Sequence, residues 1–149
     1  MEPTIAPGET VKVDLDAYDS KSPQTGDIVT FHPPRGALRK GACGAPHKPA
    51  EVCLKPTPTD PGATFLKRIV AGPGDRLAIK DGHPVVNGEL AREDFIEPCR
   101  GGRICNYPQE VTIPPDHFFV LSDNRDGSND SRIWGPVPES AIVGEVESP

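Results

Sequence analysis

The stretch TFLKRIVAGPGDRLAIKDGHPVV, residues 64–86, decides the fold class of this chain. Thr64–Ala71 is rich in apolar and β-branched residues, which is typical of a strand. A Gly-Pro-Gly-Asp turn follows, and Arg76–Lys80 then predicts a second strand. The next dipeptide, Asp-Gly, is a hairpin turn that leads into a returning strand at His83–Val86. The stretch therefore predicts antiparallel β structure.

Further short strands are expected on both sides of this stretch. Helices of any length are largely excluded, because the longest segment free of Gly and Pro is Glu9–Ser22. The remaining apolar segments alternate in hydropathy or are uniformly apolar, and they are bounded by turn residues. These strand candidates are Thr10–Leu15, Asp27–His32, Glu110–Ile113, His117–Ser122 and Ala141–Glu147.

Composition and charge limit the classes of protein that fit. The chain has 149 residues, enough for one domain, and its 15 Gly and 19 Pro indicate many turns around a modest core. The formal net charge of -6 argues against nucleic acid as a partner, because there is no basic surplus to neutralise phosphates. No apolar run approaches the length needed to span a bilayer.

Four cysteines lie in stretches rich in Gly and Pro, and their spacing favours local disulfides. We expect the pairs Cys43–Cys53 and Cys99–Cys105, which would suit a small core in an oxidising compartment. Four free thiols in a cytosolic protein are the alternative. No Cys-x-x-Cys occurs, so the usual zinc-knuckle and redox spacings are missing. We expect no bound metal and no cofactor. The first pair falls in residues 33–61, a segment without periodicity that is interpreted as a long excursion.

Lys67 lies on a strand whose alternation gives it apolar neighbours. Phe65, Lys67, Ile69 and Ala71 share one face of a regular strand. If that face packs on the core, the ammonium group is desolvated and its pKa falls. A lysine that is neutral near the working pH can act as a general base. The alternative is a lysine whose stem lies along the apolar surface while its charge reaches water.

The segment Ser122–Gly135 gathers three Asp, two Arg, two Asn and three Ser and ends beside the only Trp of the chain. Its nearly balanced charge predicts an internal network of Arg–carboxylate pairs and Asx turns. A solvated loop or a calcium loop is the alternative. The spacing of Asp123, Asp126 and Asp130 does not follow the EF-hand pattern.

Taken together, these segments resemble the type I signal peptidases. Lys-Arg-Ile, then Gly-x-Gly-Asp, then Ser-Asp-Asn-Arg-Asp-x-Ser-x-Asp-Ser-Arg-x-Trp-Gly is the order found in that family. The resemblance runs the whole length of the chain and is weakest in the two cysteine-bearing stretches. Further matches are Met1-x-Pro3-Thr4-Ile5, Gly26-Asp27-Ile28-Val29-x-Phe31, Val137-Pro138 and Ile142-Val143-Gly144.

The resemblance implies a mostly β fold of the signal peptidase/LexA-like type, in which an antiparallel catalytic core carries a small inserted β cap. The core would comprise residues 1–80 and 114–149, with the excursion 33–61 inside it, and the cap would comprise residues 81–113. The implied activity is that of a membrane-associated serine endopeptidase with a Ser–Lys dyad. It would remove signal peptides on the extracytoplasmic side of a bacterial cytoplasmic membrane, with signal peptides and the membrane surface as partners.

The family's functional residues match positions of this chain. Lys67 would be the general base, and Ser128 would orient it. Asp130 and Arg132 would form the supporting pair, while Asp123 and Arg125 match structural polar residues of the same motif. Met1 and Pro3 would contribute to substrate binding.

The nucleophile of the family directly precedes its Met-x-Pro-Thr stretch, which begins here at Met1. The nucleophilic serine, an oxyanion-hole serine and a transmembrane helix are therefore expected upstream. We interpret the chain as a fragment that is not catalytically competent by itself. Three alternatives remain: a LexA-type self-cleaving domain, a non-catalytic disulfide-stapled β module that binds extended peptides, and a peptidase in which Ser128 is itself the nucleophile.

Overall fold

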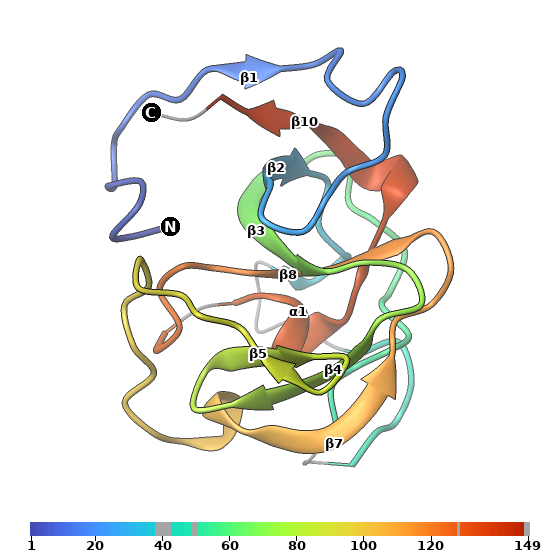
Figure 1. Cartoon of the computed structure of the whole chain (residues 1–149). Coiled ribbons are helices and arrows are strands. Elements are labelled where there is room, and N and C mark those ends of the chain that lie inside the picture. Colours follow the sequence, from blue (N-terminus) through green and yellow to red (C-terminus); the bar gives the residue numbers. More distant parts are fainter. Residues whose placement is uncertain (38–42, 49–50, 128, 148–149) are drawn as a thin grey trace.

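Two antiparallel sheets form the molecule (Figure 1). The computed structural model describes residues 1–37, 43–48, 51–127 and 129–147. The larger sheet has the strand order β1-β10-β2-β3-β8-β9, and the smaller has the order β6-β5-β4-β7. The strands are β1 (Val13–Asp14), β2 (Ile28–Phe31), β3 (Phe65–Ala71), β4 (Arg76–Lys80), β5 (His83–Val86), β6 (Glu89–Leu90), β7 (Tyr107–Thr112), β8 (His117–Leu121), β9 (Val137–Pro138) and β10 (Ile142–Val146).

The expected mostly β antiparallel fold is confirmed, and the strands fall close to their predicted positions. The short elements β6 and β9 were missed, as were the helix α1 (Ser131–Trp134) and the 3-10 turns Arg103–Cys105 and Glu139–Ala141. Such short elements carry too few residues to show a period in the sequence. Among the described residues, no helix is both long and apolar enough to cross a membrane.

Strand β3 is one of the two central strands of the larger sheet and lies between β2 and β8. Its alternation holds at first, because Phe65 and Ile69 pack on the core cluster around Trp134. The expectation that Ala71 shares this face is wrong. The pairing with β8 shifts between Ile69 and Ala71, and such an irregularity changes the side on which the next residues lie. Val70 and Ala71 consequently both join the second core cluster.

The smaller sheet packs on the larger one through an apolar layer. Leu77 and Ile79 of β4 lie fully buried in one cluster with Phe119 and Leu121 of β8. The predicted start of the cap at residue 81 falls inside this sheet, because β4 precedes it and pairs with both β5 and β7. The small sheet therefore begins at the strand after the Gly-Pro-Gly-Asp turn, while the division into core and cap remains a prediction.

The excursion 33–61 doubles back on itself wherever the structure describes it. Isolated bridges join Pro34 to Thr59 and Cys43 to Pro56. Val52 and Cys53 are buried, so this segment contributes to the core although it shows no periodicity. Its two ends lie side by side, because the backbone N–H of Asp60 donates to the carbonyl of Pro33 at 2.7 Å.

Candidate active site

A cavity of about 470 Å³ opens where the N-terminal segment, β3 and the polar loop after β8 meet. These three segments lie far apart in sequence, and the larger sheet brings them together. The residues that line the cavity are Met1, Glu2, Thr64, Phe65, Leu66, Lys67, Ser122, Asn124, Gly127 and Asn129. The cavity thus combines one lysine and one glutamate with apolar and polar side chains.

Lys67 lies in this cavity with its amino group against apolar surface. Its Nζ is 5.6 Å from the centre of the Phe65 ring and donates a 3.0 Å hydrogen bond to the carbonyl of Leu66. Burial lowers the pKa of Lys67 below its ordinary value, although the negative charges of Asp130 and Asp123 act in the opposite direction. Desolvation wins because neither carboxylate makes an ion pair with this amine among the described contacts, both being paired with arginines.

Ser128, the expected partner of Lys67, lies outside the described residues. Its two neighbours in the sequence, Gly127 and Asn129, both line the cavity. Asn124 organises the start of this loop, because its Oδ1 accepts hydrogen bonds from the backbone N–H groups of Asp126 (3.2 Å) and Gly127 (3.4 Å). This is the Asx-turn bonding that the composition of the loop predicted.

Asp130 and Arg132 form a fully buried pair behind the cavity. Arg132 donates from Nε to Oδ1 and from Nη2 to Oδ2 of Asp130, both at 2.8 Å. Burial alone would lower the pKa of the Arg132 guanidinium, but the charge and hydrogen bonds of Asp130 outweigh it and raise that pKa. Asp130 also caps α1 by accepting from the backbone N–H of Arg132. The pair therefore fixes the start of the helix that follows Ser128.

Two further Arg–carboxylate pairs hold the same loop, and each has a partner that the sequence did not reveal. Arg68 donates to both carboxylate oxygens of Asp123, at 2.9 and 2.7 Å. Arg125 donates to both oxygens of Glu93, at 2.7 Å each. Arg68 follows Lys67 on a strand, so alternation alone indicates that the two side chains point to opposite faces. Glu93 lies in a stretch without pattern.

The N-terminal segment contributes one of the two residues expected to bind substrate. Met1 lines the cavity, whereas its side chain sulfur lies close to the polar loop. Pro3 is exposed and lies outside the lining of this cavity, so its part in substrate binding stays a prediction. Ser122 was not singled out, yet it is buried and its Oγ lies 3.7 Å from Sδ of Met1.

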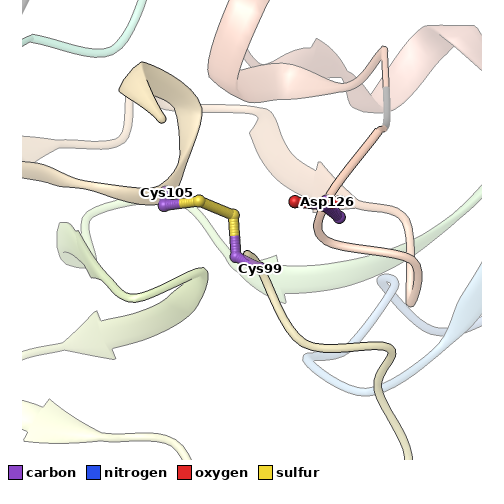
Figure 2. Close-up of side chains that lie close together, drawn as sticks. All are labelled: Cys99, Cys105 and Asp126. Atoms are coloured by element: carbon purple, nitrogen blue, oxygen red, sulfur yellow. A yellow bond between two sulfur atoms is a disulfide. The ribbon is translucent and has the colours of Figure 1, made fainter. Parts of the chain in front are cut away.

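Both local cysteine pairs are disulfides in the structure, as the spacing indicated. Figure 2 shows that Asp126 lies beside the Cys99–Cys105 bridge, although it comes from the polar loop. The backbone N–H of Arg100 donates to Asp126 Oδ1 at 2.8 Å, so the bridged segment is attached to that loop. The two sulfur atoms bind each other and are therefore not available as thiolate ligands for a metal.

Comparison with known proteins identifies the class to which this fold and cavity belong. The family model described as "Signal peptidase, peptidase S26" matches residues 1–149. The chain belongs to this peptidase family.

Individual relatives are similar over almost the whole chain. A probable signal peptidase I-1 of Synechocystis is 33% identical over 98% of this chain and 64% of its own length. The thylakoidal processing peptidase 1 of Arabidopsis thaliana is 34% identical over 97% of this chain and 37% of its own length. The chain thus spans only part of the length of these relatives. Signal peptidase I of Enterococcus faecalis V583 has a similar fold, with a TM-score of 0.55 and 24% identity over 85% of this chain and 98% of the solved one.

Proposed function

We propose that this chain is the catalytic portion of a signal peptidase I, a serine endopeptidase that removes signal peptides from exported preproteins. The observation that carries the proposal is that Met1 and Lys67 line the same cavity. A residue directly before Met1 would start beside the lysine. A serine at that position would have a general base within reach, and a Ser–Lys dyad is a known variant of serine protease chemistry.

The proposed reaction needs a neutral amine, which the lowered pKa of Lys67 favours. Lys67 Nζ takes the proton from the serine hydroxyl as the serine oxygen attacks the carbonyl carbon of the scissile peptide bond. Collapse of the tetrahedral intermediate breaks the C–N bond, and the proton passes from Lys67 to the leaving amine. Water then attacks the acyl-enzyme carbonyl with Lys67 again as the base, the ester C–O bond breaks, and Lys67 returns the proton to the serine oxygen. Ser128 orients the amine, and the Asp130–Arg132 pair holds the loop that carries Ser128.

The substrate class follows from the lining of the cavity and from the family. Phe65, Leu66 and Met1 supply apolar surface around Lys67, which fits small side chains such as Ala at the residues before the cut. The proposed setting is the extracytoplasmic side of a bacterial cytoplasmic membrane, where exported preproteins still carry their signal peptides. The chain from Met1 onward is expected to fold without cleaving, because the proposed nucleophile belongs to the preceding residue.

The experiment compares three chains on a fluorogenic signal-peptide substrate in detergent. They are the chain as printed, the same chain preceded by its natural upstream residues with Ser directly before Met1, and that extended chain with Lys67→Met. Only the second should cleave. Cleavage by the printed chain that disappears in its Ser128→Ala variant would make Ser128 the nucleophile. An inactive extended chain that still binds extended peptides would favour the non-catalytic β module.

A further inference from the structure

We propose that Thr4 is a positioning residue, whose hydroxyl holds the N-terminal segment Met1–Ile5 on the buried carboxylate of Asp123 and so places the residue before Met1 against Lys67. This inference rests on the proposed function, because it concerns where the proposed nucleophile stands. The sequence motif contains Thr4, but no role follows from its position there.

The contact is made to a carboxylate that is already fixed. Thr4 Oγ1 donates to Asp123 Oδ2, and Asp123 is fully buried. The same carboxylate accepts the two parallel bonds from Arg68. A hydroxyl bound to a buried, paired carboxylate makes a charge-assisted hydrogen bond, which is shorter and stronger than a neutral one. Asp123 can therefore serve as a rigid anchor for the N-terminal segment.

Arg68 connects that anchor to the strand that carries Lys67. The two residues are consecutive on β3, so one backbone presents the lysine to the cavity and the arginine to Asp123. The guanidinium is held on two further sides, by a 2.9 Å bond from Nη1 to the carbonyl of Gly26 and by the Phe95 ring at 4.4 Å. A displacement of Thr4 relative to Asp123 is thus also a displacement relative to Lys67.

The rest of the segment transmits this placement to its first residue. Ile5 is buried with Ile28 and Val146, and its backbone N–H donates to the carbonyl of Met1 at 3.1 Å. These contacts fold Met1 back toward the cavity that it lines with Lys67. Ile5 holds the segment to the sheet through apolar packing, which has no preferred direction. The Thr4 hydrogen bond supplies the direction that a nucleophile needs.

A positioning role differs from a structural one in what its loss should change. Without the Thr4 hydroxyl, Asp123 keeps both bonds from Arg68 and Ile5 keeps its apolar packing, so the fold should persist. The serine before Met1 would lose its fixed distance to Lys67, and small misplacements of reacting groups cost rate steeply. Turnover should fall much more than substrate binding, because most of the cavity lining belongs to β3 and the polar loop, which Thr4 does not hold.

The test uses the full-length protein in detergent with the substitution Thr4→Val, which keeps the shape and removes the hydroxyl. We expect kcat to fall about 10- to 100-fold, with KM within about twofold of the parent value. Thr4→Ser restores the hydroxyl and should recover most of kcat. Thr10→Val makes the same chemical change at an exposed position of the same N-terminal region and should leave kcat unchanged.

The outcomes separate this inference from the function on which it rests. A parent enzyme that does not cleave, or whose cleavage survives Lys67→Met, overturns both. An active, Lys67-dependent parent whose Thr4→Val variant keeps full kcat overturns the positioning role alone. Loss of cooperative thermal unfolding in Thr4→Val also overturns it, because Thr4 would then serve the fold. A Thr4→Ser variant that loses as much kcat as Thr4→Val overturns the positioning role as well, because the hydroxyl would then not be what matters.

Discussion

The charged form of Lys67 destabilises the folded state, because its amine is desolvated. The same desolvation favours the neutral amine that the proposed reaction needs. The Lys67 amine is desolvated in the cavity, and the two nearby aspartates, Asp123 and Asp130, form ion pairs with arginines. The pKa of Lys67 in the folded state therefore lies below the ordinary value of 10.5 that applies to the unfolded chain. In the pH window between these two values the unfolded state binds more protons, so stability rises with pH there.

The substitution Lys67→Met tests whether stability rises with pH in this window because of Lys67. Below the lowered pKa the folded chain bears the full cost of a partly desolvated ammonium, so the variant should be more stable than the parent at neutral pH. The difference in stability between the variant and the parent should shrink as the pH rises toward 10.5. Thermal unfolding followed by circular dichroism across this range measures it. A Lys12→Met control, changed at the exposed end of a surface ion pair, should show no such gain at neutral pH. A destabilised Lys67→Met chain would contradict the lowered pKa.

The Asp130–Arg132 pair illustrates the opposite case, a buried charge whose partner is essential. Asp130→Asn leaves the fully buried guanidinium of Arg132 without its counter-ion. Breaking such a pair from one side costs about 3–5 kcal/mol of unfolding free energy. Urea unfolding of the chain measures the loss, and Glu147→Gln at the exposed Lys12–Glu147 pair is the matched control. Equal midpoints for the two variants would argue against a buried, essential pair.

At the scale of elements, the bridged segment 97–105 and the polar loop behave as one unit. Glu97 and the loop exchange two backbone hydrogen bonds, from Glu97 N–H to Asp123 and from Arg125 N–H to Glu97, both at 3.0 Å. Gly82 adds a close approach, because a Cβ there would lie 2.7 Å from Cβ of Cys99 and its φ is +83°. The Cys99–Cys105 bridge therefore limits the motion of a segment that supports the proposed active-site loop.

Replacing both Cys99 and Cys105 by Ser should destabilise the chain by about 2 kcal/mol, because the bridge closes a short loop and restricts the unfolded chain. Urea unfolding under non-reducing conditions measures the difference from the parent. Intact mass should first show the parent four hydrogens lighter than its fully reduced form, as two disulfides require. A parent with four alkylatable thiols would contradict both bridges.

Element boundaries show what alternation in the sequence can and cannot predict. Strands β3, β4 and β5 were predictable because each has enough residues to show a period and is followed by a turn that contains Gly. The shift near Val70 was not, because a bulge depends on pairing with β8, which lies far along the chain. Likewise Glu93 could not be recognised as the partner of Arg125, because its stretch has no period and the contact is purely tertiary.

At the scale of the whole molecule, the larger sheet explains how residues from opposite ends of the chain form one cavity. Strand β3 lies between β2 and β8, so Lys67 lies beside the loop that follows β8. The N-terminal segment packs on β2 and β10 through Ile5 and lines the same cavity through Met1. In Figure 1 the N-terminal segment lies beside this sheet, while the smaller sheet lies below it. The motifs singled out Met1 and Lys67, but only the strand order shows that these two line one cavity.

The most direct measurement of the central claim locates the nucleophile chemically. The full-length protein is treated with a serine-directed acylating or phosphonylating probe, and the modified peptide is identified by mass spectrometry. The account predicts a label on a serine directly before Met1, absent from a folded Lys67→Met variant because the hydroxyl then has no base. A label on Ser128 instead, or labelling that is unchanged without Lys67, would contradict it.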